Sequence, residues 1–288
     1  MIFELKQKIR YSRSVDKFLN WFKRTPAFPS CYWLIGKMGL AETHAKQNTA
    51  ASKKYFGENQ AKIKQVLDLL ADKRSKKILL TNIKRRMAGF WFMNGTPQDQ
   101  YFPADIIHLS PDEVFVDCGA YEGDTIAVFR KLTQDRYKKI IALEPTPAFV
   151  DKIVAQQNPR CEVLAYGVWD KKDTQSFYVD GSSSIMSCLV QETGAQQITI
   201  SLEKIDNLPA CGEMTFLKMD IEGAELNALK GAEQTIRRQR PKLAICIYHS
   251  DVDMLEIPLW VARLNMGYKL YVRHHGDGNL IETVLYAV

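Results

Sequence analysis

Short, continuous apolar runs alternate with stretches of helical periodicity from about residue 110 to the end of the chain. The apolar runs predict strands at about residues 113–117, 139–144, 161–166, 214–220 and 242–248. Apolar residues that recur every three or four positions predict helices at about residues 124–133, 147–157, 224–239 and 253–265. Strands that are apolar on both faces and separated by helices are typical of a parallel sheet with helices on each side.

Two segments depart from this alternation. Residues 174–179 and 197–202 alternate polar and apolar positions, as half-exposed strands do, around a polar loop at 181–184. At the C-terminus, residues 268–275 and 282–288 predict the two strands of a β-hairpin. The predicted fold class is therefore α/β: a doubly wound, Rossmann-like sheet that ends in an antiparallel hairpin.

Residues 1–108 predict an N-terminal helical region, with helices at 61–70 and 78–87. Residues 1–108 contain 20 lysines and arginines and 8 aspartates and glutamates, which gives a net charge of +12. Residues 109–288 contain 19 and 25 of these, which gives a net charge of −6. A solvated helix face explains the basic clusters better than an anionic partner does. We therefore divide the chain into domains at 1–108 and 109–288.

Residues 114–125 combine a buried strand, a glycine turn and the start of a helix. The strand ends at Asp117, and the turn contains Gly119 and Gly123. Asp124 and Thr125 begin the helix, whose free N–H groups suit a carboxylate or a phosphate. This motif predicts a small polar ligand at the end of the strand.

The acid at Asp117 narrows the choice of ligand, because dinucleotide-binding turns have a glycine at that place. An acid favours a ligand with a cationic group, and S-adenosyl-L-methionine offers an ammonium, a carboxylate and a sulfonium. The next strand ends in Glu144 and Pro145, near the offset at which α/β units place a carboxylate on a ribose diol.

These motifs resemble the FkbM family of S-adenosyl-L-methionine-dependent methyltransferases. The matching pieces are residues 115–124, 142–145, 181–184, and 216–225 leading into 229–232. The resemblance implies a class I methyltransferase fold over about residues 100–288, with the cofactor at the carboxyl ends of the strands. It also implies O-methylation of a hydroxyl on a carbohydrate or natural product, so that the partner is a small-molecule or glycan acceptor.

The resemblance further implies where the cofactor lies. The first turn would hold the methionine part, Glu144 the ribose, and the segment after the third strand the adenine. The expected cofactor-binding residues are Asp117, Gly119, Ala120, Tyr121, Gly123, Asp124, Thr125, Glu144, Pro145, Gly167, Val168, Trp169 and Asp220. Trp169 is bulkier than the small residues expected beside adenine, although its ring can stack on a base.

Candidate catalytic residues follow the fourth and fifth strands. Asp220 and Glu222 end the fourth strand, where they can act as a general base or, with Glu225, complement the N-terminus of the next helix. His249 ends the fifth strand, and its imidazole suits proton transfer near neutral pH. Asp220 and Glu222 alone are too small a ligand set for a metal ion, and the six cysteines lack metal-type spacing, so no metal is expected.

Two other functions remain open at this stage. The +12 N-terminal part allows a nucleic-acid methyltransferase, although nucleic acid is the less favoured acceptor. The second alternative is a non-catalytic protein that binds the cofactor and serves as a binding partner of another protein. No stretch predicts a membrane span, and residues 1–10 lack the apolar core of a signal peptide, so we expect a cytoplasmic protein. Whether the chain forms a homodimer stays open at this stage.

Overall fold

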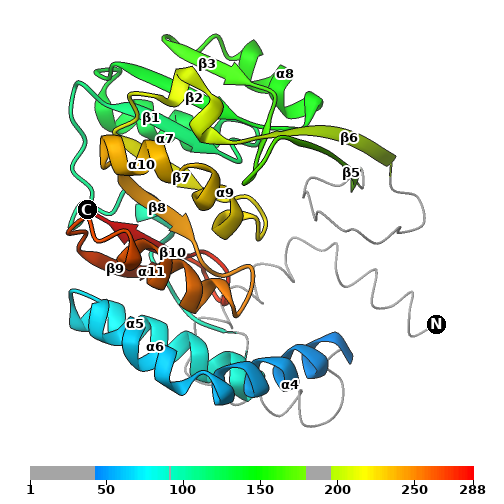
Figure 1. Cartoon of the computed structure of the whole chain (residues 1–288), viewed down its shortest axis with the longest axis vertical. Helices are drawn as coiled ribbons and strands as arrows, with labels where there is room; N and C mark the ends of the chain where they lie inside the picture. Colours follow the sequence, from blue (N-terminus) through cyan, green and yellow to red (C-terminus); the bar gives the residue numbers. More distant parts are fainter. Residues whose placement is uncertain (1–42, 91, 180–195) are drawn as a thin grey trace, which may run out of the picture.

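A seven-stranded sheet forms the centre of the computed structural model, which describes residues 43–90, 92–179 and 196–288 (Figure 1). Its strand order is β3-β2-β1-β7-β8-β10-β9. The strands are β1 (Val114–Cys118), β2 (Lys139–Leu143), β3 (Cys161–Leu164), β7 (Phe216–Met219), β8 (Lys242–Cys246), β9 (Leu270–His274) and β10 (Thr283–Ala287). The strands β3, β2, β1, β7 and β8 pair in parallel, whereas β10 is antiparallel to both its neighbours. This arrangement confirms the predicted fold class.

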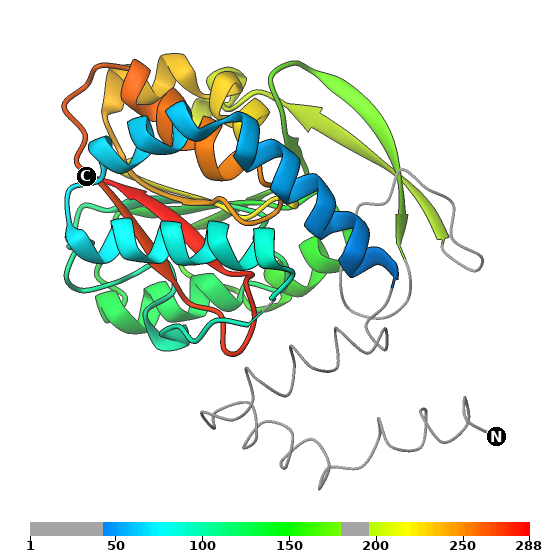
Figure 2. The ribbon, with the colours of Figure 1, turned by 90° about the horizontal axis from the view of Figure 1, so that it is seen from below.

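Helices cover both faces of this sheet (Figure 2). They are α7 (Asp124–Thr133), α8 (Pro147–Ala155), α9 (Glu225–Gly231), α10 (Glu233–Gln239) and α11 (Asp253–Arg263), with short 3-10 helices at Pro97–Asp99, Ile205–Asn207 and Pro209–Cys211. The buried residues form two clusters: α9, α10 and α11 pack on one face of the sheet, and α7 and α8 pack on the other.

The single helix predicted at 224–239 is wrong, because the chain turns between α9 and α10. Ala232, which joins the two helices, has φ −111° and ψ 0°. At Gly231, an added Cβ would lie 2.0 Å from the carbonyl oxygen of Trp169. The turn therefore brings the backbone against the segment that carries Trp169, a tertiary contact that helical periodicity does not reveal.

Of the N-terminal helices α4 (Thr43–Glu58), α5 (Gln60–Leu69) and α6 (Lys73–Ala88), α6 packs against the sheet, α5 packs on α11, and α4 packs on α5 and α6. Leu79 and Ile83 of α6 belong to the same buried cluster as β7 and β8, and α6 lies beside the edge strand β9. Arg86 of α6 donates to the carbonyl of Tyr248 at 2.6 Å and forms an ion pair with Asp251. Helix α6 thus supports the loop after β8, while the domain boundary at residue 108 stays a prediction.

A second, three-stranded sheet has the order β4-β6-β5. Its strands are β4 (Gly167–Val168), β5 (Asp173–Val179) and β6 (Gln196–Glu203). The β5–β6 pair projects from the main body and confirms the two strands predicted around residue 181 (Figure 1). The polar loop at 181–184 lies outside the described residues. Within the described ranges, no helix has the length and apolar character that crossing a membrane would require.

His274 in β9 is buried and held in its neutral form. Its Nε2 donates to the carbonyl of Met93, and its Nδ1 accepts from the hydroxyl of Thr283 at 2.9 Å. Burial lowers the pKa of His274 from its ordinary 6.5 to about 4. As pH falls from 6.5 towards 4, the unfolded chain therefore binds a proton at this residue that the folded chain does not.

We expect this difference to remove about 2 kcal/mol of stability between pH 7 and pH 5. Urea denaturation of the protein and of His274→Gln at both pH values measures the effect. The variant should lose less stability on acidification than the parent chain by about that amount. Equal losses would show that His274 titrates normally in the folded protein.

Candidate active site

A cavity of about 600 Å³ opens at the carboxyl ends of β1, β2 and β7. Its size lies in the range of sites that bind small molecules and cofactors. The predicted site residues that line it are Gly119, Tyr121, Asp124, Thr125, Glu144, Pro145, Gly167, Val168, Trp169, Asp220 and Glu222. The structure therefore brings together segments that lie up to a hundred residues apart. Asp117, Ala120, Gly123 and His249 do not line the cavity.

Gly119 forms the tight turn between β1 and α7. Its φ is +75°, and an added Cβ would lie 2.0 Å from the backbone oxygen of Asp220. Only glycine fits a turn that is both left-handed and this close to another backbone. The turn places the cavity-lining residues of β1 and β7 directly beside each other.

Glu144 lies at the end of β2, on the cavity wall. Its carboxylate accepts hydrogen bonds from the backbone N–H of Tyr121 at 3.0 Å and of Thr146 at 2.9 Å. Burial raises the pKa of Glu144, and these two N–H groups oppose the rise. Each carboxylate oxygen keeps a further lone pair, so the group can still accept a hydroxyl.

Asp117 lies beneath the turn and is fully buried. The β1–β7 register sets it opposite Lys218, whose ammonium is 2.9 Å from the carboxylate. Lys218 also donates to the carbonyls of Gly119 at 2.8 Å and Cys118 at 3.3 Å. Burial raises the pKa of Asp117, and Lys218 opposes that rise. The pair supports the turn from below.

Asp220 is fixed by two tyrosine hydroxyls. Tyr101 donates to Oδ2 at 2.6 Å and Tyr248 donates to Oδ1 at 3.1 Å. Burial alone would raise the pKa of Asp220, but the charge of Lys218 and the Tyr101 hydrogen bond lower it. Asp220 is therefore an ionised, immobile acceptor at the cavity wall.

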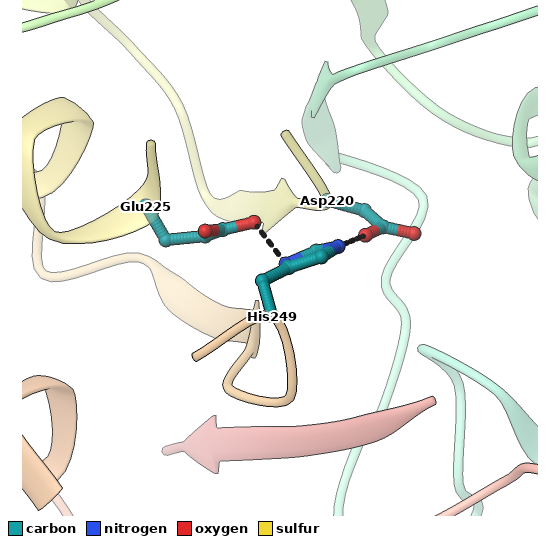
Figure 3. Close-up of side chains that lie close together, drawn as sticks. All are labelled: Asp220, Glu225 and His249. Atoms are coloured by element: carbon teal, nitrogen blue, oxygen red, sulfur yellow. Dashed lines mark ion pairs between the residues drawn. The ribbon is translucent and has the colours of Figure 1, made fainter. Parts of the chain in front are cut away.

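His249 lies behind Asp220, between carboxylates (Figure 3). Its Nδ1 is 3.0 Å from Oε1 of Glu225, and its Nε2 is 3.4 Å from Oδ1 of Asp220 and 3.4 Å from Oε2 of Glu222. Burial lowers the pKa of His249, but the neighbouring acids outweigh this effect and raise it to about 9. Burial raises the pKa of Glu222, which is half-exposed.

Gln100, Tyr101 and Glu282 are among the cavity residues that lie outside every sequence motif. Gln100 and Tyr101 precede β1, and Glu282 precedes β10. Gln100 donates to Glu282, and burial together with the charge of Asp220 raises the pKa of Glu282 to about 7. Tyr101 and Glu282 have φ values of 63° and 64°, which non-glycine residues rarely adopt. No local sequence pattern signals these three residues.

The wall from Gly119 to Trp169 fits S-adenosyl-L-methionine. Gly119 lines the cavity at the strand end, Glu144 offers a carboxylate to hydroxyls, and Trp169 offers a ring. The acids of the opposite wall suit the positive charge of a sulfonium. The site therefore has the donors and shape that this cofactor requires.

Comparison with known proteins agrees with this reading. A family model described as the methyltransferase FkbM domain matches residues 117–270, more than half of the chain. The crystal structure of methyltransferase FkbM from Methylobacillus flagellatus KT has a TM-score of 0.68 and 24% identity, and the match covers 82% of this chain and 60% of that one. The chain thus spans about 60% of the length of that structure.

Two further structures are more distant. An rRNA methylase from Streptococcus thermophilus has 13% identity and a TM-score of 0.40, over 62% of this chain and 87% of that one. A SAM-dependent methyltransferase from Aquifex aeolicus has 14% identity and a TM-score of 0.35, over 62% of this chain and 84% of that one. No curated protein sequence matches the chain. The family model, which matches more than half of the chain, shows that the chain belongs to the FkbM family of methyltransferases, which use S-adenosyl-L-methionine.

Proposed function

We propose that the protein transfers a methyl group to a hydroxyl oxygen of a carbohydrate or natural product. The observation that carries this proposal is one continuous cavity that is lined both by the residues expected to bind the cofactor and by an acidic wall of three carboxylates, Asp220, Glu222 and Glu282. Carboxylates accept hydrogen bonds from hydroxyl groups, so this wall suits a hydroxylated acceptor.

On the cofactor side, the turn at Gly119 and the start of α7 would hold the methionine part. Glu144 would hold the ribose, and the segment from Gly167 to Trp169 would face the adenine. When bound, the cofactor supplies an electrophilic methyl group: a C–O bond forms as the C–S bond breaks, and the electron pair of that bond stays on sulfur. Asp117, with Lys218, would keep the turn in place.

On the acceptor side, the carboxylates would align the hydroxyl and take its proton. Positioning of the two reactants can lower the barrier by about 7–11 kcal/mol. Asp220, clamped by Tyr101 and Tyr248, would supply this alignment. Glu282 is the best suited of the three to take the proton, because its pKa is near neutrality.

Transfer of a labelled methyl group to a panel of polyhydroxylated compounds, amines, thiols and RNA tests the function. We expect labelled ether products only. Glu282→Gln should lower kcat by about 10²-fold with the affinity for the cofactor unchanged, because the amide cannot take the proton. Labelling of amines alone would contradict O-methylation, and labelling of RNA alone would contradict a carbohydrate or natural-product acceptor. Unchanged turnover in Asp220→Asn, Glu222→Gln and Glu282→Gln would contradict the acidic wall.

A further inference from the structure

We propose that the protein binds a divalent cation on the Nε2 side of His249, with Asp220 and Glu222 as the other protein ligands. The sequence alone offered only two carboxylates for such a site. The structure adds an imidazole nitrogen between them. The role that we give to the cation rests on the proposed O-methylation, whereas the site itself rests on geometry.

The distances at Nε2 match those between two ligands of one metal ion. Nε2 is 3.4 Å from Oδ1 of Asp220 and 3.4 Å from Oε2 of Glu222, and it forms no hydrogen bond with the described residues. Two ligands about 2.0–2.1 Å from an ion and at a tetrahedral angle lie about 3.3–3.4 Å apart. An ion at this point would bind Nε2 and Oδ1 of Asp220, and the half-exposed side chain of Glu222 would have to turn its carboxylate toward the ion to complete the set.

Glu225 is the ion-pair partner of the other ring nitrogen of His249, although the contact does not have hydrogen-bond geometry. Its Oε1 faces Nδ1 at 3.0 Å, on the side of the ring away from Asp220 (Figure 3). A histidine that binds a metal through one nitrogen usually directs the N–H of its other nitrogen to a carboxylate. Asp220, Glu225 and His249 lie close enough to share an ion, but the ring separates the two carboxylates, so Glu225 is the orienting group.

Acids outnumber basic groups around His249. Glu225 is completely buried, and its Oε2 has no hydrogen-bond partner among the described residues. Four carboxylates lie in this region, and within the described ranges none forms an ion pair with a lysine or arginine: Asp220, Glu222, Glu225 and Glu282. The positive groups that act on Asp220 are the nearby charge of Lys218 and the imidazole of His249. Buried carboxylates normally require a paired cation or a metal.

The ligand set of one imidazole and two carboxylates suits Mn²⁺, Fe²⁺ or Zn²⁺ better than Mg²⁺, which prefers oxygen ligands. Asp220 and Glu222 line the cavity, so the free positions of the ion would face the acceptor. An ion there would hold neighbouring oxygens of the acceptor and lower the pKa of the hydroxyl that is methylated. The acceptor class that this predicts is a compound with two adjacent oxygen atoms, such as a vicinal diol.

Binding of Mn²⁺ to the metal-free, full-length protein, followed by electron paramagnetic resonance and calorimetry, tests the site without any methyl acceptor. We expect one Mn²⁺ per chain. Glu222→Gln, at a half-exposed position that should tolerate the change, is expected to weaken binding by more than about tenfold, and Glu225→Gln by about 10–100-fold. Glu282→Gln is the matched control: it removes a cavity acid outside the ligand set and should leave Mn²⁺ affinity nearly unchanged.

Three results would overturn the inference: no binding at millimolar Mn²⁺, equal weakening in Glu222→Gln and Glu282→Gln, or methyl transfer that is unaffected by prolonged chelation. The last result would leave the proposed function intact. Binding of Mn²⁺ without methyl transfer to any hydroxyl would support the site and contradict the proposed function instead. The two proposals therefore fail in different experiments.

Discussion

Replacing Lys218 by methionine is expected to lower the free energy of unfolding by about 3–5 kcal/mol, since removing one partner of a buried ion pair leaves the other charge uncompensated. Asp117 is completely buried, and Lys218 is only 3% exposed. The change would also leave the carbonyls of Gly119 and Cys118 without their side-chain donor. Since these groups form the end of β1, the loss would reach the cofactor wall as well.

Urea denaturation followed by circular dichroism measures this loss. The double variant Asp117→Asn/Lys218→Met should recover part of the stability, because it removes the buried negative charge along with its partner. Lys138→Met is a matched control, since Lys138 pairs with Glu213 at the surface and its loss should change stability little. A Lys218→Met variant as stable as Lys138→Met would show that the buried pair does not support the fold.

The Asp117–Lys218 pair also shows where prediction from the sequence ends. Apolar runs and helical periods identified the strands of the main sheet because burial on both faces leaves a local pattern. The acid at Asp117 was equally visible, and it led to a role in binding the cofactor. Lys218 lies beside Asp117 because of the register in which β1 and β7 pair. The two residues are about a hundred positions apart in the sequence, so no local pattern encodes their contact.

The same limit applies to the acceptor side of the cavity. His249 was predicted at the end of a strand, but its position between Glu225 and Asp220 depends on how β7 and β8 pack. Tyr101 and Glu282 come from loops without a motif and reach the cavity only through the folded chain. Helix α4 was missed because its sequence is mostly polar and has little helical periodicity.

Gly119→Ala is expected to reduce kcat/KM by more than about 10²-fold, because a displacement of about 1 Å at a reacting centre can cost that much. The added Cβ would lie 2.0 Å from the backbone oxygen of Asp220, and neither backbone can turn away without moving its strand end. The φ of +75° adds strain that alanine tolerates poorly. Both walls of the cavity should therefore move, so that cofactor affinity and turnover fall together.

Isothermal titration with S-adenosyl-L-methionine and a steady-state assay measure the two effects separately. Gly57→Ala is the matched control, because no atom lies within 4 Å of an added Cβ there and the residue is within helix α4, where alanine is favoured. That variant should keep both cofactor affinity and turnover. If Gly119→Ala weakened cofactor binding but left kcat unchanged at saturating cofactor, Asp220 would not depend on the turn, and the two walls would act independently. A fall in both quantities would mean instead that the backbone contact between Gly119 and Asp220 aligns the cofactor with the acceptor.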